Sequence, residues 1–87
     1  LIKDIKKEFS GCIVLKNDSS YMQGVPDLLV LHNDKWATLE VKRNKTAKHQ
    51  PNQDYYVEKM HSMSYSAFIY PENKDKIMSD LRKVFKE

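Results

Sequence analysis

The chain of 87 residues is long enough for one small domain, because single domains typically hold about 50–200 residues. Hydrophobic residues make up 40% and charged residues 31% of it, which excludes a disordered chain, and its apolar runs are too short to cross a bilayer. Fifteen Lys and Arg against twelve Asp and Glu give a net charge of +3, a mild excess that favours a polyanionic partner. Residues 1–9 carry too many charges for a secretory signal, so we expect a soluble, cytoplasmic protein with no membrane partner.

The first part of the chain predicts one helix and two strands. Apolar residues recur at i, i+3 and i+7 from Ile2 to Phe9, which predicts a helix that ends before Ser10. Residues 12–15 are short, apolar and β-branched, as expected of a buried strand. Residues 27–31 form a continuous apolar run, which is typical of a central strand covered on both faces.

The second part predicts a hairpin, a helix, a strand and a final helix. The turn signal at residues 33–34 joins the run at 27–31 to a strand at 36–42. Pro51 suits the first position of the next helix, and residues 67–70 form a short strand. The apolar faces of the two later helices are predicted to be Tyr56, Met60 and Met63, and then Ile77, Met78, Leu81, Val84 and Phe85. The order is α-β-β-β-α-β-α, an α/β (α+β) fold with a mixed central sheet flanked by helices.

The predicted hairpin brings three charged residues together. If it is centred between Asn33 and Asp34, the numbers of facing residues sum to 67, and Asp27 lies opposite Glu40. Glu40 and Lys42 share one face of their strand about 7 Å apart, because side chains alternate along a strand. Two carboxylates and one ammonium therefore converge on one patch, where directly opposed like charges destabilise a sheet.

A hard divalent cation would compensate for the repulsion between Asp27 and Glu40. Carboxylate oxygens suit Mg²⁺ at about 2.0–2.1 Å, with waters completing the octahedron. Lys42 beside such a site can hold or deprotonate a water, while the cation neutralises charge on a phosphate under attack. The alternative is an ion-pair network in which Lys42 neutralises both acids structurally. The spacing and the register favour the metal site.

These residues also resemble a known family. Residues 24–27, Gly-Val-Pro-Asp, followed after the hairpin by residues 39–42, Leu-Glu-Val-Lys, resemble the PD-(D/E)xK nuclease motif. The flanks resemble its virus-type replication-repair nuclease branch, VRR-Nuc, over about residues 12–70. The resemblance implies a restriction-endonuclease-like core, with residues 1–87 as a single nuclease domain that uses Mg²⁺ or Mn²⁺ to hydrolyse DNA. It also implies a homodimer that cuts branched DNA such as Holliday junctions, in a phage or DNA-repair setting.

The resemblance carries roles onto matching positions. Asp27 and Glu40 match the metal-binding acids, and Lys42 matches the catalytic lysine. Val41 matches the residue whose main-chain carbonyl completes the metal shell. Gln53 matches the glutamine of the following helix, a catalytic role, and hydrogen bonding at the helix end is its alternative.

Three further positions are candidates for the same site. Gln50 is the second choice for the helix glutamine. The acid that the family carries on its first helix could be Glu8 or Asp4, although its expected place falls at or before Leu1.

A basic segment follows the motif. Four residues of this segment could bind DNA phosphates next to the acid patch: Arg43, Lys45, Lys48 and His49. Lys16 at the end of the first strand is a weaker candidate. A merely solvated loop is the alternative for this segment. The histidines lack metal-ligand spacing and are predicted to be ordinary surface residues: His32, His49 and His61.

Two other functions compete with the nuclease. A non-catalytic DNA-binding module would keep the fold and bind DNA without metal. A structural domain would use the acids and the lysine only as an ion-pair network and would not respond to Mg²⁺ or Mn²⁺.

Overall fold

The structure, a computed structural model, describes residues 1–18 and 20–86. Within these residues one sheet has the strand order β1-β2-β3-β4, with β3 and β4 parallel and the other neighbours antiparallel. The strands are β1 (Ile13–Lys16), β2 (Leu28–His32), β3 (Lys35–Val41) and β4 (Tyr65–Ile69). The helices are α1 (Ile2–Glu8), α2 (Gln53–Met63) and α3 (Lys74–Phe85), with a 3₁₀ turn, η1 (Pro71–Asn73), before α3. The predicted α+β class, mixed sheet and element order are confirmed.

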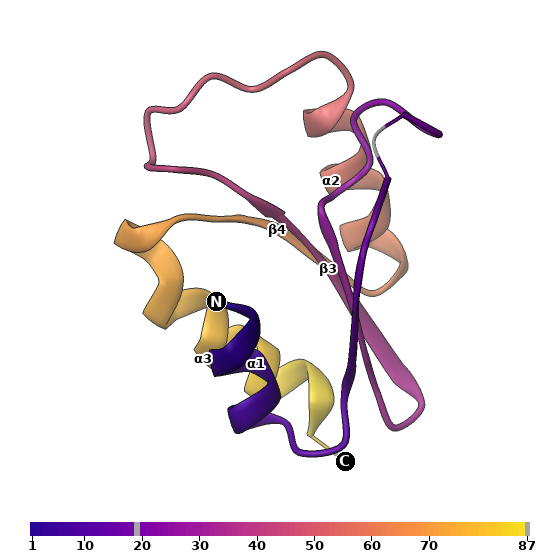
Figure 1. The fold of residues 1–87 in the computed structure, drawn as a ribbon, viewed down its shortest axis with the longest axis vertical. Coiled ribbons are helices and arrows are strands. Elements are labelled where there is room, and N and C mark those ends of the chain that lie inside the picture. Colours follow the sequence, from indigo (N-terminus) through magenta and orange to yellow (C-terminus); the bar gives the residue numbers. More distant parts are fainter. Residues whose placement is uncertain (19, 87) are drawn as a thin grey trace.

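Helices lie on both faces of the sheet, with α1 and α3 together on one face and α2 on the other (Figure 1). None of the helices in 1–18 and 20–86 is long and apolar enough to span a bilayer. The core lies between the sheet and the α1/α3 pair, where Val30, Ala37 and Leu39 are fully buried. Ion pairs between Asp4 and Lys74, and between Glu8 and Arg82, join the two helices at their surface. Four residues of the predicted apolar face of α3 are buried: Ile77, Met78, Leu81 and Phe85. The fifth, Val84, is only half-buried.

The hairpin has the predicted register. Asn33 adopts φ 58°, a left-handed conformation that Asn tolerates well in turns. Leu28 then pairs with Leu39 and Val30 with Ala37, so facing numbers sum to 67. Because this turn fixes the register, it also decides which residues stand at the open end of the hairpin.

The first two strands are less covered than predicted. Ile13 and Leu15 of β1 are 55% and 46% exposed, so the prediction of a buried strand is wrong. On the same face, Leu29 and Leu31 of β2 are only half-buried, so β2 is not fully covered on both faces. The reason is that α2 packs on β3 and β4 and leaves the β1 side of this face open (Figure 1).

The helix α2 begins later than predicted. Pro51 lies in a turn, and Asn52 adopts φ 73°, which ends the turn and makes Gln53 the first helical residue. Val57 rather than Met63 is buried, and Met63 is 63% exposed. The face toward the sheet is therefore the i, i+4, i+7 set of Gln53, Val57 and Met60. This shift directs the Gln53 side chain at the sheet.

Candidate active site

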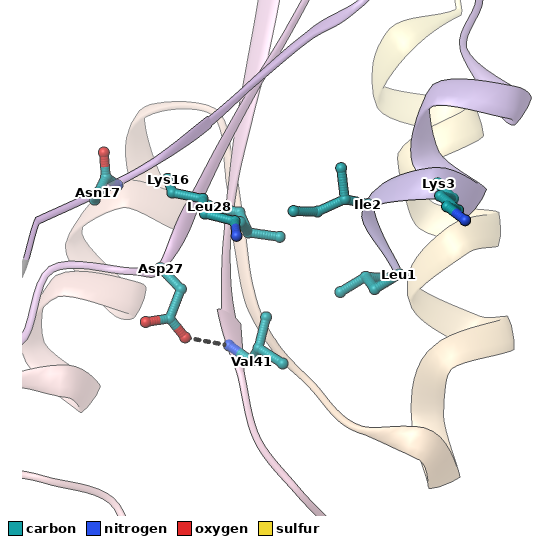
Figure 2. Close-up of a pocket in the computed structure, with 8 residues that line it drawn as sticks. All are labelled: Leu1, Ile2, Lys3, Lys16, Asn17, Asp27, Leu28 and Val41. Carbon is teal, nitrogen blue, oxygen red and sulfur yellow. Dashed lines mark hydrogen bonds between the residues drawn. The ribbon is translucent and has the colours of Figure 1, made fainter.

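The acid pair lies at the open end of the hairpin. Glu40 projects from β3 toward α2, because Leu39 and Val41 occupy the opposite face. Asp27 directly precedes β2, where the hairpin register continues opposite Glu40. The Val41 main-chain N–H donates a 2.9 Å hydrogen bond to Asp27 Oδ2, which fixes this carboxylate beside the end of β3 (Figure 2).

The segment before Asp27 is held from both sides. Gly24 adopts φ 92°, and a Cβ there would lie 2.6 Å from Asn52 Cβ, so only glycine allows this approach to the start of α2. The Asn17 side-chain amide donates to the Pro26 carbonyl at 2.6 Å, and the Asn17 N–H donates to the Asp27 carbonyl at 2.7 Å. The loop that carries Asp27 is therefore fastened to both β1 and α2.

The Gln53 amide joins the acid to the amine. Its Nε2 donates to Glu40 Oε2 at 3.0 Å, and its Oε1 accepts from Lys42 Nζ at 2.5 Å. The same Oε1 accepts the Gln50 main-chain N–H at 2.8 Å, so Gln53 makes the helix-end hydrogen bond and the contact with Glu40 at the same time. Lys42 Nζ also donates to the Lys48 carbonyl at 3.1 Å and lies 3.9 Å from Glu40 Oε2.

The Glu40 carboxyl is buried and only partly compensated by its neighbours. The side chains of Glu40 and Lys42 are 5% and 10% exposed. Burial, and after it the Asp27 charge, raise the pKa of Glu40 from 4.5 to about 7, while Lys42 acts in the opposite direction. Glu40 Oε1 is buried and has no hydrogen-bond partner within residues 1–18 and 20–86. A buried oxygen of this kind is costly unless something binds it.

The donor set fits a hard divalent ion. Glu40 Oε1 has no hydrogen-bond partner among the described residues and belongs to a carboxyl that interacts with Asp27, and the Val41 main-chain carbonyl lies at the same strand end. Among the described residues no group of three or more His, Cys, Asp or Glu side chains could hold a metal. Two acids suit an ion that keeps several waters, as Mg²⁺ does, and do not suit a closed zinc site.

Comparison with known proteins gives structural matches only. No family model matches the sequence, and neither does any curated protein. A solved VRR_NUC domain is similar over 90% of this chain and 89% of its own, with 28% identity and a TM-score of 0.66. A VRR_NUC domain protein is similar over 84% of this chain and 67% of its own, at 15% identity and a TM-score of 0.60, which shows the fold alone.

The match at 28% identity supports the VRR-Nuc family assignment and a nuclease-family domain. The match at 15% identity supports the fold. The residues around the acid pair can therefore be considered as parts of a VRR-Nuc-like site.

Cationic residues lie on two sides of the VRR-Nuc-like acid pair. Lys16 lines a cavity of about 590 Å³ beside Asp27, and Figure 2 shows its side chain lying over Leu28. Arg43 and Lys48 line a hollow of about 440 Å³ on the other side of Val41. Gln50 lines the same hollow, and Lys45 is exposed in the loop that surrounds it.

Neither candidate for the first-helix acid, Glu8 or Asp4, joins this site. Glu8 Oε2 accepts a 2.9 Å hydrogen bond from Arg82 of α3, and Asp4 pairs with Lys74. The start of α1 faces the cavity instead, with Leu1 and Ile2 across from Asp27 (Figure 2). Glu8 lies six residues beyond Ile2, about 9 Å along the helix at 1.5 Å per residue, which is why it reaches α3 and not the acids.

The histidines are not all ordinary surface residues, so that prediction is wrong for one of them. The His32 ring lies 5.7 Å from the Phe9 ring and 5.5 Å from the Phe85 ring, and its Nδ1 is buried. His49 and His61 are exposed as predicted, yet each makes a specific contact. Phe68 was not predicted to lie near the acids, yet it pairs with Glu40 across the parallel β3–β4 ladder. Turn chemistry could not reveal this partner, because no short turn joins parallel strands.

Proposed function

We propose that residues 1–87 form one VRR-Nuc-like domain that hydrolyses DNA phosphodiester bonds as an Mg²⁺- or Mn²⁺-dependent endonuclease, acting on DNA inside the cell. The observation that carries the proposal is the buried, unpartnered Oε1 of Glu40 beside Asp27, described within residues 1–18 and 20–86. A structural ion-pair network would instead leave this acid oxygen paired. Lys42, the only cation bonded into this network among the described residues, lies 3.9 Å from the other Glu40 oxygen.

Each residue has a distinct part in the proposed hydrolysis. Asp27 and Glu40 would hold the divalent ion together with the main-chain carbonyl of Val41. The ion would supply neutralisation of the phosphate charge and a lowered pKa of the attacking water. Water attacks the phosphorus in line, and the 3′ oxygen leaves. Lys42 has three N–H donors, of which Gln53 and a main-chain carbonyl engage two, so the third is available to orient that water.

The cationic residues would bind the DNA backbone on both sides of the scissile phosphate. Lys16 lies on the α1 side of Asp27, whereas Arg43, Lys45 and Lys48 belong to the loop beyond Val41. Phosphate contacts release counterions, so affinity for DNA should fall steeply with salt concentration. We propose branched DNA, such as a Holliday junction, as the preferred substrate.

A homodimer would supply one active site for each of two strands. Ile13 and Leu15 are exposed next to half-buried Leu29 and Leu31, which gives β1 an apolar outer face. Within the described residues the outer edge of β1 has no strand partner, and such an edge favours pairing with another chain. In sedimentation, the protein should have about twice its monomer mass of 10.3 kDa, and Ile13→Lys should halve it. A wild-type monomer at micromolar concentration would exclude the dimer.

Cleavage of synthetic four-way junction, flap and linear duplex DNA tests the proposal. The wild type should cut only with Mg²⁺ or Mn²⁺ and should prefer the junction. Asp27→Asn and Lys42→Met should each lower the rate by about 10² or more, the usual scale for loss of a group acting on the transition state. Glu8→Gln is the matched control and should cut at the wild-type rate. Cleavage that survives both site substitutions would overturn the assignment, and metal-independent binding without product would indicate a DNA-binding module.

A further inference from the structure

One exposed histidine fastens the loop between β3 and α2 next to the acid pair. The His49 ring stacks on Phe68 with 4.0 Å between ring centroids and 15° between planes. Its Nδ1 lies 2.8 Å from Asp54 Oδ1 in the first turn of α2. Phe68 is the β4 residue that pairs with Glu40. His49 therefore connects the loop both to the strand beside Glu40 and to the helix that carries Gln53.

The residues on either side of His49 hold the proposed catalytic amine. The Lys48 carbonyl accepts from Lys42 Nζ at 3.1 Å. The Gln50 N–H donates at 2.8 Å to Gln53 Oε1, the other acceptor of Lys42. The direction in which Lys42 points thus depends on where the main chain at 48–50 lies. Lys42 itself cannot fix this main chain, since a lysine side chain has many rotamers.

We propose that His49 is a positioning residue for Lys42. Its stack on Phe68 and its hydrogen bond with Asp54 hold the Lys48 carbonyl in place, so that the Lys42 ammonium is presented to the reaction in one orientation. This inference rests on the proposed function for the role of Lys42. The competing interpretation is that His49 binds a DNA phosphate directly. It is disfavoured because Phe68 covers one face of the ring and Asp54 engages Nδ1.

Two separate readouts test the positioning role. The first is the ¹H–¹⁵N signal of Lys42 Nζ in the free protein without metal or DNA, assigned by comparison with Lys42→Met. In the wild type this ammonium should be distinct from those of exposed lysines, because it has fixed acceptors and is 10% exposed. His49→Ala should move the signal to the position of exposed lysines. His49→Phe, which keeps the stack, should restore part of the shift.

The second readout is steady-state cleavage of the junction substrate. His49→Ala and Asp54→Ala should each lower kcat by about 10-fold while KM changes little, because misplacing a reacting group costs rate and not binding. Two α2 residues serve as matched controls and should retain the wild-type kcat: His61→Ala and Glu58→Ala. A raised KM with unchanged kcat, together with a salt slope smaller by about one, would mean a phosphate contact and would overturn the inference.

The two readouts also separate this inference from the proposed function. An unchanged Lys42 signal in His49→Ala overturns the positioning role even if the wild type cuts DNA. A wild type that cuts no substrate overturns the proposed function, whereas a displaced Lys42 signal in His49→Ala would still support the part of His49 in holding the amine.

Discussion

Replacing Glu40 by Gln should stabilise the metal-free protein at neutral pH. Burial and Asp27 raise the pKa of Glu40 from 4.5 to about 7 in the folded state. Between these values the unfolded chain has lost this proton while the folded protein retains it, so ionisation favours unfolding as the pH rises. The cost is absent below about pH 4.5, grows to about pH 7 and is constant above it. A neutral glutamine side chain at this position removes the cost.

The size of the gain follows from the pKa and from the contacts that Gln would keep. The interval from 4.5 to about 7 corresponds to roughly 3 kcal/mol at 1.36 kcal/mol per pH unit. A Gln at this position can still accept from Gln53, but Lys42 loses its nearby negative charge. We therefore expect a net gain of about 1–3 kcal/mol at pH 8 and about zero at pH 4.5.

Urea denaturation in EDTA at pH 4.5 and pH 8 measures this difference directly. Glu8→Gln is the matched control, since Arg82 holds the pKa of Glu8 below its usual range and loss of that pair should slightly destabilise the protein at pH 8. A Glu40→Gln protein that is less stable than the wild type at pH 8, or that gains equally at both pH values, would refute this account of the acid pair.

Three further predictions concern the loop before Asp27, a contact between β4 and α3, and metal binding. Gly24→Ala should lower the free energy of unfolding by about 1–3 kcal/mol, measured by urea denaturation, because the new Cβ meets Asn52 and φ is 92°; an unchanged midpoint would contradict this packing. Tyr65→Phe should lower the free energy of unfolding by about 1 kcal/mol in the same assay, because the Tyr65 hydroxyl donates to Asp80 at 2.9 Å. An unchanged free energy of unfolding would show that this hydrogen bond does not stabilise the protein. Mn²⁺ at 100 times its Kd should stabilise the wild type by about 2.7 kcal/mol in thermal unfolding and should not stabilise Asp27→Asn, whereas equal stabilisation of both would place the ion elsewhere.

Local signals predicted the parts of this structure that local chemistry determines. The turn at Asn33 sets the register of β2 and β3, so the sequence alone predicted Asp27 opposite Glu40. The apolar period of α3 predicted its buried face, because a helix of 12 residues repeats the pattern several times. Gln53 was singled out by resemblance, and its hydrogen bond with the Gln50 main chain shows that the helix-end alternative also holds.

Non-local packing determines the parts that the sequence did not reveal. Ile13 is exposed because α2 covers β3 and β4 and not β1. The position of α2 follows from its place in the crossover between the parallel strands β3 and β4. The start of α2 depends on the left-handed Asn52, whose conformation accompanies its close approach to Gly24. The His49 stack on Phe68 depends on a parallel register, which no short turn fixes.

The most direct test of the central claim is an anomalous difference map, recorded at the manganese absorption edge, from crystals grown with Mn²⁺. The account predicts a single strong peak within ligand distance of both the Asp27 carboxylate and Glu40 Oε1. A map without a peak there, at a Mn²⁺ concentration that supports cleavage, or with its strongest peak at other residues, would contradict it.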